Sequence, residues 1–170
     1  MSKTKILLDA DVIIHFSVAG KLSFLPAILD EYEHIVLSKV FEELRKAERT
    51  CINNMEQTFH NISVHKFAPQ GAMLQEYACL LATRGKGESA CMAYCKFNKD
   101  IIGSSNLKDI HDYCLSNNIT YLTTFDFLYF AIQRNKMSIA EARQFVCDVK
   151  ANGSKLPDKD IATYVSSVVI

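Results

Sequence analysis

Two aspartates follow the first apolar run of this 170-residue chain. Residues 6–8 have the pattern of a short buried strand, and Asp9 and Asp11 come directly after it, before a second apolar run at residues 12–14. An ionised carboxylate in such a segment is costly unless a cation or several hydrogen-bond donors compensate its charge. Asp9 is therefore a candidate ligand for a hard divalent cation, with the N-cap of the next helix as the structural alternative. For Asp11 we expect a structural role or a position just behind the ligands.

Further oxygen-bearing side chains stand at three later positions where they could join this pair. Glu43 lies beside the apolar stripe of a helical pattern, and Glu88 opens a helical pattern that is almost wholly apolar. Residues 104–109, Ser-Ser-Asn-Leu-Lys-Asp, follow another short apolar run. Structural alternatives stay open for both glutamates, since Glu43 can be an ordinary helix-face residue and Glu88 can simply complement the positive end of its helix dipole.

Short apolar runs alternate with helical patterns, which predicts an α/β fold: a three-layer α/β/α sandwich with a mostly parallel central sheet. The carboxyl ends of parallel strands share one edge of the sheet, where ligands bind in such folds. Asp9 and residues 104–109 are expected at that edge, and the helices carrying Glu43 and Glu88 could reach it. The predicted strands are 6–8, 34–37, 61–67, 100–103 and 119–124, and the predicted helices are 12–19, 22–32, 40–46, 71–83, 88–97, 107–115 and 127–133.

Local signals add detail to this pattern. Ser38 is predicted to cap the helix at 40–46, and Ser138 begins a Ser-x-x-Glu capping box that opens a last helix. Gly85 and Gly87 are expected to separate two helices and to let the second begin in a close approach of backbones.

Composition bounds the class of protein. The chain is long enough for one domain over residues 1–170, with residues 154–170 as a docked tail. It carries 19 basic and 19 acidic residues, so the zero net charge argues against strong non-specific binding to nucleic acid or membrane. No apolar run is long enough for a membrane span. The six cysteines form no CxxC pair, which favours reduced thiols in a cytoplasmic protein and argues against zinc.

The ordered set of motifs resembles the PIN domain family of metal-dependent nucleases. The branch it resembles has a Gly-x-x-Glu-Ala form of the third motif, and its members are often toxins of toxin–antitoxin pairs. The resemblance extends over most of the chain and rests on residues 7–14, 40–44, 85–93, 104–109 and 153–157.

The resemblance implies a set of site residues for Mg²⁺ or Mn²⁺. The first three family acids fall on Asp9, Glu43 and Glu88. The fourth falls on Asn106, where an amide replaces the expected carboxylate and contributes an oxygen but no charge. Asp109 stands beside it as a further ligand. Behind the ligands we place Asp11, Ser105 and Asp126, and Asp109 or Asp126 could supply the missing charge.

The function implied is a Mg²⁺- or Mn²⁺-dependent endoribonuclease acting on single-stranded or looped RNA, with an antitoxin protein as a partner and a homodimer as an assembly to test. Arg84, Lys86 and Lys108 lie next to the motifs and are expected to contact the RNA backbone. One alternative is a catalytically weak or inactive PIN-fold binding or scaffold protein. Another is a flavodoxin-like phosphoacceptor domain, which also gathers acids at strand ends.

Overall fold

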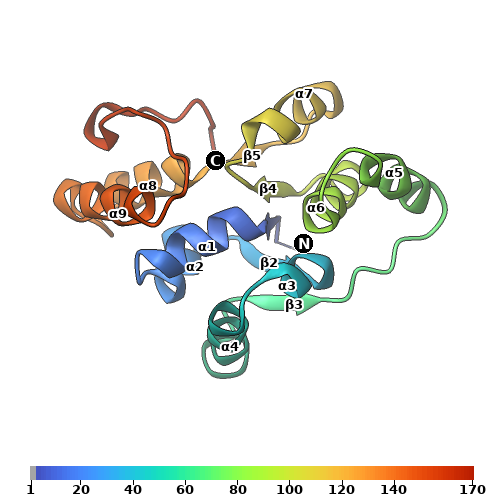
Figure 1. Ribbon diagram of the computed structural model, residues 1–170, viewed down its shortest axis with the longest axis horizontal. Helices are drawn as coiled ribbons and strands as arrows, with labels where there is room; N and C mark the ends of the chain where they lie inside the picture. Colours follow the sequence, from blue (N-terminus) through green and yellow to red (C-terminus); the bar gives the residue numbers. More distant parts are fainter. Residues whose placement is uncertain (1–2) are drawn as a thin grey trace.

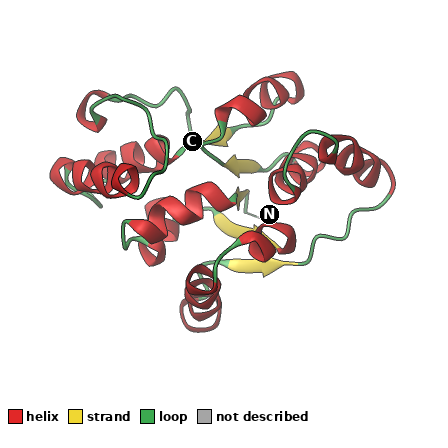
Figure 2. Cartoon of the chain, viewed as in Figure 1, coloured by secondary structure: helices red, strands yellow, loops and turns green. Residues whose placement is uncertain are grey.

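A five-stranded, all-parallel sheet forms the centre of the computed structural model, which describes residues 3–170 (Figures 1 and 2). The strands lie in the order β3-β2-β1-β4-β5. The prediction of an α/β fold with a mostly parallel sheet is confirmed. The strands are β1 (Lys5–Leu8), β2 (Glu33–Leu37), β3 (Ser63–His65), β4 (Ile101–Gly103) and β5 (Tyr121–Leu122).

Helices cover both faces of this sheet and complete the three-layer sandwich. The α-helices of the described residues are α1 (Ala10–Val18), α2 (Leu25–Ile28), α3 (Ser38–Glu43), α4 (Lys46–Asn54), α5 (Gly71–Leu81), α6 (Lys86–Asn98), α7 (Leu107–Asn117), α8 (Thr124–Gln133) and α9 (Ile139–Ala151). Short η1 (Leu22–Phe24), η2 (Met55–Phe59) and η3 (Ile161–Thr163) segments adjoin them. In Figure 1, α1, α2, α8 and α9 lie on one side of the strands and α5, α6 and α7 on the other.

The direction in which the chain crosses the sheet explains this division for the helices that connect two strands, whereas α8 and α9 follow the last strand, β5. From β1 the chain adds β2 and β3 on one side, and it then returns to add β4 and β5 on the other side of β1. Crossovers between parallel strands are right-handed, so reversing the direction moves the connecting helices to the opposite face. The reversal creates a switch point between β1 and β4, the place where α/β sheets bind ligands at their carboxyl ends.

This strand order also separates the fold from one alternative. Flavodoxin-like domains have the order 2-1-3-4-5, whereas this sheet has 3-2-1-4-5. The flavodoxin-like phosphoacceptor hypothesis is therefore wrong about the fold.

Two apolar layers hold the helices on the sheet. On one face the ring of Phe16 packs edge-on against Phe145 and Phe127, with centroids 4.7 and 6.1 Å apart. On the other face α6 contributes the buried Cys91, Met92 and Cys95. Burial of apolar side chains on both faces of a parallel sheet is the arrangement that continuous apolar strands require.

Two local predictions about the ends of α3 are wrong. Ser38 is the first residue of α3 and not its N-cap, because its hydroxyl accepts a hydrogen bond from the Phe67 backbone N–H at 3.0 Å. The helix predicted to reach residue 46 ends at Glu43, since the buried Leu44 is extended (φ −74°, ψ 150°) and a separate helix, α4, follows.

The carboxy-terminal segment packs against α8 and α9. Its η3 turn contacts both helices, and Asp160 forms a salt bridge with Arg143 at 2.6 Å. Tyr164 and Ser166 donate hydrogen bonds to Asp126. These contacts hold residues 160–166 against α8 and α9.

No single helix within residues 3–170 is long and apolar enough to cross a membrane. The sharply bent pair α1 and η1–α2, at 119°, meets the criterion on length and composition alone.

Candidate functional site

The register of β1 and β4 places Asp9 beside Ser104 at the switch point. Leu8 pairs with Gly103, and the Asp9 N–H donates to the Gly103 carbonyl at 2.8 Å. The Ser104 hydroxyl then donates to Oδ2 of Asp9 at 3.1 Å, while Oδ1 accepts from the Ala10 N–H at 2.8 Å. Asp9 is thus the N-cap of α1, and each of its two carboxylate oxygens accepts a hydrogen bond.

Asp11 is tied to the loop that follows β4. Its carboxylate accepts hydrogen bonds from the backbone N–H groups of Val12 and Ser105, both at 2.7 Å. The Ser105 hydroxyl donates to Thr124 Oγ1 at 2.8 Å, which extends the network to the start of α8. Asp11 and Ser105 therefore fix the loop next to Asp9.

Glu43 is held against α6 at the end of α3. Its Oε1 accepts a hydrogen bond from the Gly87 N–H at 2.8 Å. A Cβ atom at position 87 would lie 2.7 Å from Oε2 of Glu43 and 3.1 Å from the Cα of Val40. The predicted close approach of backbones is thus confirmed at Gly87, whereas Gly85 caps α6 with open space around it.

Glu88, Asn106 and Asp109 form a second group beside the first. The Asn106 amide nitrogen donates to Oε1 of Glu88 at 2.9 Å and to Oδ2 of Asp109 at 2.7 Å. The amide thus bridges two carboxylates that would otherwise repel each other. Asn106 provides hydrogen-bond donors at the position where the family resemblance implies another acid.

The charges of these acids shift one another's pKa values. Burial raises the pKa of Asp9 well above its ordinary value, and the charges of Asp11 and Glu88 raise it further. The pKa of Glu88 is raised to about 7, mainly by burial and then by the charge of Asp109. The pKa of the buried Cys91 thiol is also raised well above its ordinary value, first by burial and then by Asp9, with contributions from Glu43 and Asp11. The carboxylates of Asp9, Asp11 and Glu43 therefore all lie near one point on α6.

Basic side chains do not neutralise these acids directly. Within residues 3–170, the salt bridges involve none of the five carboxylates at positions 9, 11, 43, 88 and 109. Arg84 lowers the pKa of Glu88 through its charge, and its Nε donates to the Asp109 backbone carbonyl at 3.1 Å. The five acids are thus held by neutral hydrogen-bond donors, and Arg84 is a fixed guanidinium beside them.

Asp126 lies in a different environment from the other predicted site residues. It forms a capping box with Thr123 at the start of α8, and its Oδ1 accepts hydrogen bonds from Tyr164 and Ser166 at 2.7 and 2.6 Å. Its oxygens are engaged in capping and in holding the tail. Among the described residues, the structure does not join Asp126 to the Asp9–Glu88 group.

The side chains of this site offer carboxylate, amide and hydroxyl oxygens, which are the ligand atoms that a hard cation prefers. In the arrangement of residues 3–170, no group of three or more His, Cys, Asp or Glu side chains could hold a metal ion. Glu43 is turned to Gly87, and Glu88 and Asp109 are turned to Asn106. To bind these carboxylates, a cation would thus have to displace the Gly87 N–H and the Asn106 amide from them.

Sequence reasoning did not single out Ser104 or Thr124. Ser104 is fully buried and touches both aspartates, and Thr124 links Ser105 to the ring of His15. The signal for Ser104 was its place as the first residue after a strand next to β1. Thr124 gave no comparable signal, because its partner lies 109 residues away.

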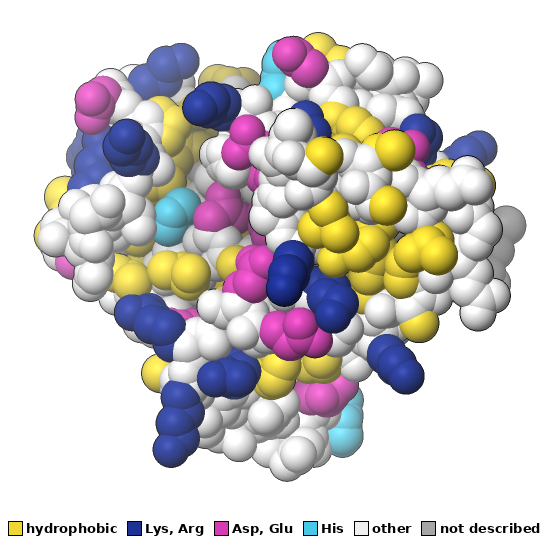
Figure 3. Space-filling view, turned by 45° about the vertical axis from the view of Figure 1, so that its right-hand side comes forward, with side chains coloured by type: hydrophobic (Ala, Val, Ile, Leu, Met, Phe, Trp, Pro, Cys, Tyr) yellow, Lys and Arg dark blue, Asp and Glu magenta, His cyan; other side chains and the backbone are white. Residues whose placement is uncertain are grey.

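Acidic side chains gather in a hollow on the face shown in Figure 3, and Lys and Arg side chains stand around it. Lys86 and Lys108, the basic residues nearest the motifs besides Arg84, are both exposed. An acidic hollow with basic neighbours can bring a cation and a phosphate to one place.

No family profile and no curated protein matches the chain.

Proposed function

We propose that this chain is a PIN-type, Mg²⁺- or Mn²⁺-dependent endoribonuclease that hydrolyses phosphodiester bonds of single-stranded or looped RNA. One observation supports the proposal: Asp9, which follows β1, lies at the switch point of a parallel sheet near acids of α3, α6 and α7, and none of these acids takes part in a salt bridge among residues 3–170. A buried acid whose pKa is raised is destabilised in its charged form. A divalent cation would relieve that cost.

Asp9, Glu88 and Asp109 are the residues that we expect to hold the cation, with Glu43 and the carbonyl oxygen of Asn106 beside them. When bound, the cation supplies a Lewis acid for phosphodiester hydrolysis. Asp109 replaces the charge that an acid at position 106 would bring, because its carboxylate lies within 2.7 Å of the Asn106 amide.

The other residues of the site position these ligands. Ser104 orients Asp9 through its hydroxyl, and Asp11 holds the loop that carries Asn106 through the Ser105 N–H. Arg84 is fixed by its bond to Asp109 and can contact an RNA phosphate, as can the exposed Lys86 and Lys108.

The partners that we propose follow from the resemblance to the PIN domain family. An antitoxin protein or a second copy of the chain could cover apolar side chains that are exposed on α5 and at the end of α6; Leu74, Leu81 and Phe97 are 50%, 37% and 43% exposed. The proposed compartment is the cytoplasm, where all six cysteines, unpaired in the structure, would stay reduced.

Cleavage of mixed single-stranded RNAs in Mg²⁺ or Mn²⁺ tests the function. Asp9→Asn and Glu88→Gln should each reduce cleavage about 100-fold or more, and a chelator should abolish it. Glu42→Gln, which changes an exposed glutamate next to Glu43, serves as the matched control and should cleave as the wild type does. Equal cleavage by wild type and Glu88→Gln would remove Glu88 from the mechanism.

A second candidate, a PIN-fold scaffold without catalysis, is favoured by the Asn106 bridge. The bridge satisfies Glu88 and Asp109 without any cation, as an inactive site would. Calorimetric titration with Mn²⁺ separates the two candidates. Binding that is lost in Asp9→Asn supports the nuclease, and the absence of Asp9-dependent binding supports the scaffold.

A further inference from the structure

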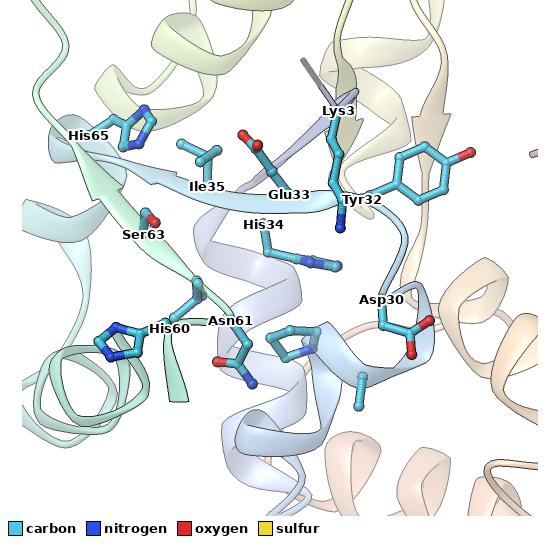
Figure 4. A pocket seen from close by; sticks show the side chains of 13 residues that line it. Lys3, Asp30, Tyr32, Glu33, His34, Ile35, His60, Asn61, Ser63 and His65 are labelled. Carbon is cyan, nitrogen blue, oxygen red and sulfur yellow. The ribbon is translucent and has the colours of Figure 1, made fainter. Parts of the chain in front are cut away.

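A second pocket lies at the opposite edge of the sheet from the acids. It has a volume of about 560 Å³ and opens at the amino ends of β2 and β3 (Figure 4). Its wall includes Lys3, Pro26, Asp30, His34 and Asn61. The volume falls within the range of small-molecule sites, roughly 300–1,000 Å³.

Two polar atoms in this wall have no hydrogen-bond partner among residues 3–170: Nε2 of His34 and Oδ1 of Asn61. His34 is only 2% exposed, and its ring extends into the space between Lys3, Asp30 and Asn61 (Figure 4). More than nine in ten buried polar groups in proteins have a partner, because an unpaired one costs stability. Two such atoms in one pocket therefore point to a ligand.

The chemistry of the two atoms defines what that ligand must offer. Burial lowers the pKa of His34 to about 4, so the ring is neutral at physiological pH. A neutral imidazole carries its proton on one of its two ring nitrogens, and in the tautomer with the proton on Nδ1 the unpartnered Nε2 is an acceptor. Asn61 Oδ1 is an acceptor as well.

We propose that this pocket binds a small organic cation with N–H donors, best matched by a guanidinium group, that donates to Nε2 of His34 and Oδ1 of Asn61. A guanidinium has five N–H donors and no acceptor, which complements a pair of unpaired acceptors. It is planar and weakly hydrated, so it enters a half-apolar pocket more readily than other cations. The exposed carboxylate of Asp30 lies in the same wall, where it forms a salt bridge with Lys136 at 3.3 Å.

The Lys3 side chain provides a test of the charge of the ligand. It belongs to the pocket wall, and in Figure 4 its ammonium group approaches the His34 ring. A cation is thus already present at the mouth of the pocket. It would compete weakly with a bound cation and would attract a bound anion.

Binding of agmatine, which carries a guanidinium and an ammonium group, tests the proposal on the full chain by NMR and calorimetry. We expect saturable shifts of the His34 and Asn61 side-chain signals. Tetramethylammonium, a cation without N–H groups, and acetate should cause none. Saturable binding of tetramethylammonium at His34, or of acetate, would overturn the proposal, as would the absence of agmatine binding.

Variants locate the site. His34→Phe and Asn61→Leu keep side-chain size and remove one acceptor each, so each should weaken agmatine binding roughly tenfold. His111→Phe on α7 is the matched control for the histidine, and Glu88→Gln tests for binding at the acidic site. Neither should change the affinity. Loss of binding in Glu88→Gln alone would assign agmatine to the acids and overturn the proposal.

Lys3→Gln provides a test that does not depend on the folding of buried variants. The Lys3 side chain is exposed, and its removal takes one positive charge from the mouth of the pocket. Agmatine binding should become about two- to threefold tighter. An unchanged or weaker affinity would contradict a cationic ligand.

Discussion

The side-chain amide of Asn106 donates a hydrogen bond to Oε1 of Glu88 across 2.9 Å. The same nitrogen reaches Asp109 at 2.7 Å, so two acids share one neutral donor. The amide therefore stabilises this corner of the site in the way that a cation would, and four predictions follow from the arrangement of the site and its supports.

Replacing Asn106 by Asp should lower the stability of the metal-free protein and raise its affinity for a divalent cation. The Asn106→Asp variant places a third carboxylate beside Glu88 and Asp109, so the apo protein should melt at a lower temperature. Mn²⁺ binding should tighten about tenfold, because the site gains a charged oxygen ligand. Calorimetric titration and thermal unfolding measure the two effects. Asn53→Asp, on the exposed surface of α4, is the control, and unchanged Mn²⁺ affinity in Asn106→Asp would refute this role of position 106.

Glu88 should make the metal-free protein less stable as the pH rises. Its pKa of about 7 in the folded state exceeds the ordinary value of 4.5, so the folded chain binds more protons than the unfolded chain between these values. Stability due to this group is full near pH 4–5 and is lost as the pH rises through 7.

Glu88→Gln should therefore match the wild type near pH 5 and exceed it by about 1–2 kcal/mol at pH 8, since solvent screening reduces the effect of a partly exposed charge. Urea unfolding in a chelator at the two pH values measures the difference. Glu42→Gln should show no such pH dependence, and a Glu88→Gln variant that is less stable at pH 8 would contradict the assignment.

Gly87 should tolerate no side chain, in contrast to Gly85. A Cβ at position 87 would come within 3.1 Å of the Val40 backbone and 2.7 Å of Glu43, whereas at position 85 nothing lies within 4 Å. Gly87→Ala should destabilise the protein by about 1–2 kcal/mol, because overpacking exceeds the gain in helix propensity. Gly85→Ala should change stability by less than about 0.5 kcal/mol. Equal effects of the two substitutions in denaturant unfolding would disprove the close approach.

The tail should depend on the hydroxyl of Tyr164. Tyr164→Phe removes the 2.7 Å hydrogen bond to Asp126, a bond to a charged group that is worth about 1.5–3 kcal/mol. Limited proteolysis should then cleave the segment after Gly153 faster than in the wild type. Tyr129→Phe, a neighbouring ring in contact with Tyr164, is the control. Cleavage at the wild-type rate would show that the tail is held by other contacts.

The sheet and the position of its acids could be predicted because both depend on local pattern. Apolar runs such as residues 6–8 become strands wherever helices cover them, and their carboxyl ends share an edge by geometry. Asp9 was placed at that edge for this reason. Asp11 and Ser105 were predicted beside it because they immediately flank or follow strands.

Contacts between distant segments decided the rest. The hydroxyl of Ser38 accepts from Phe67, so it is not available to cap a helix, and Asp126 is engaged by a tail that lies about forty residues further on. Sequence spacing contains no record of such partners, because a polar side chain has several acceptors or donors of similar energy within reach.

The sequence by itself thus determined which oxygen-bearing side chains follow the strands and how many of them are acidic. Only the tertiary structure shows that the Asn106 amide bridges Glu88 and Asp109, and that polar atoms of His34 and Asn61 in one pocket have no partner among residues 3–170. The physical reason is that hydrogen-bond partnership depends on distances of a few tenths of an ångström, and only the packed chain defines them.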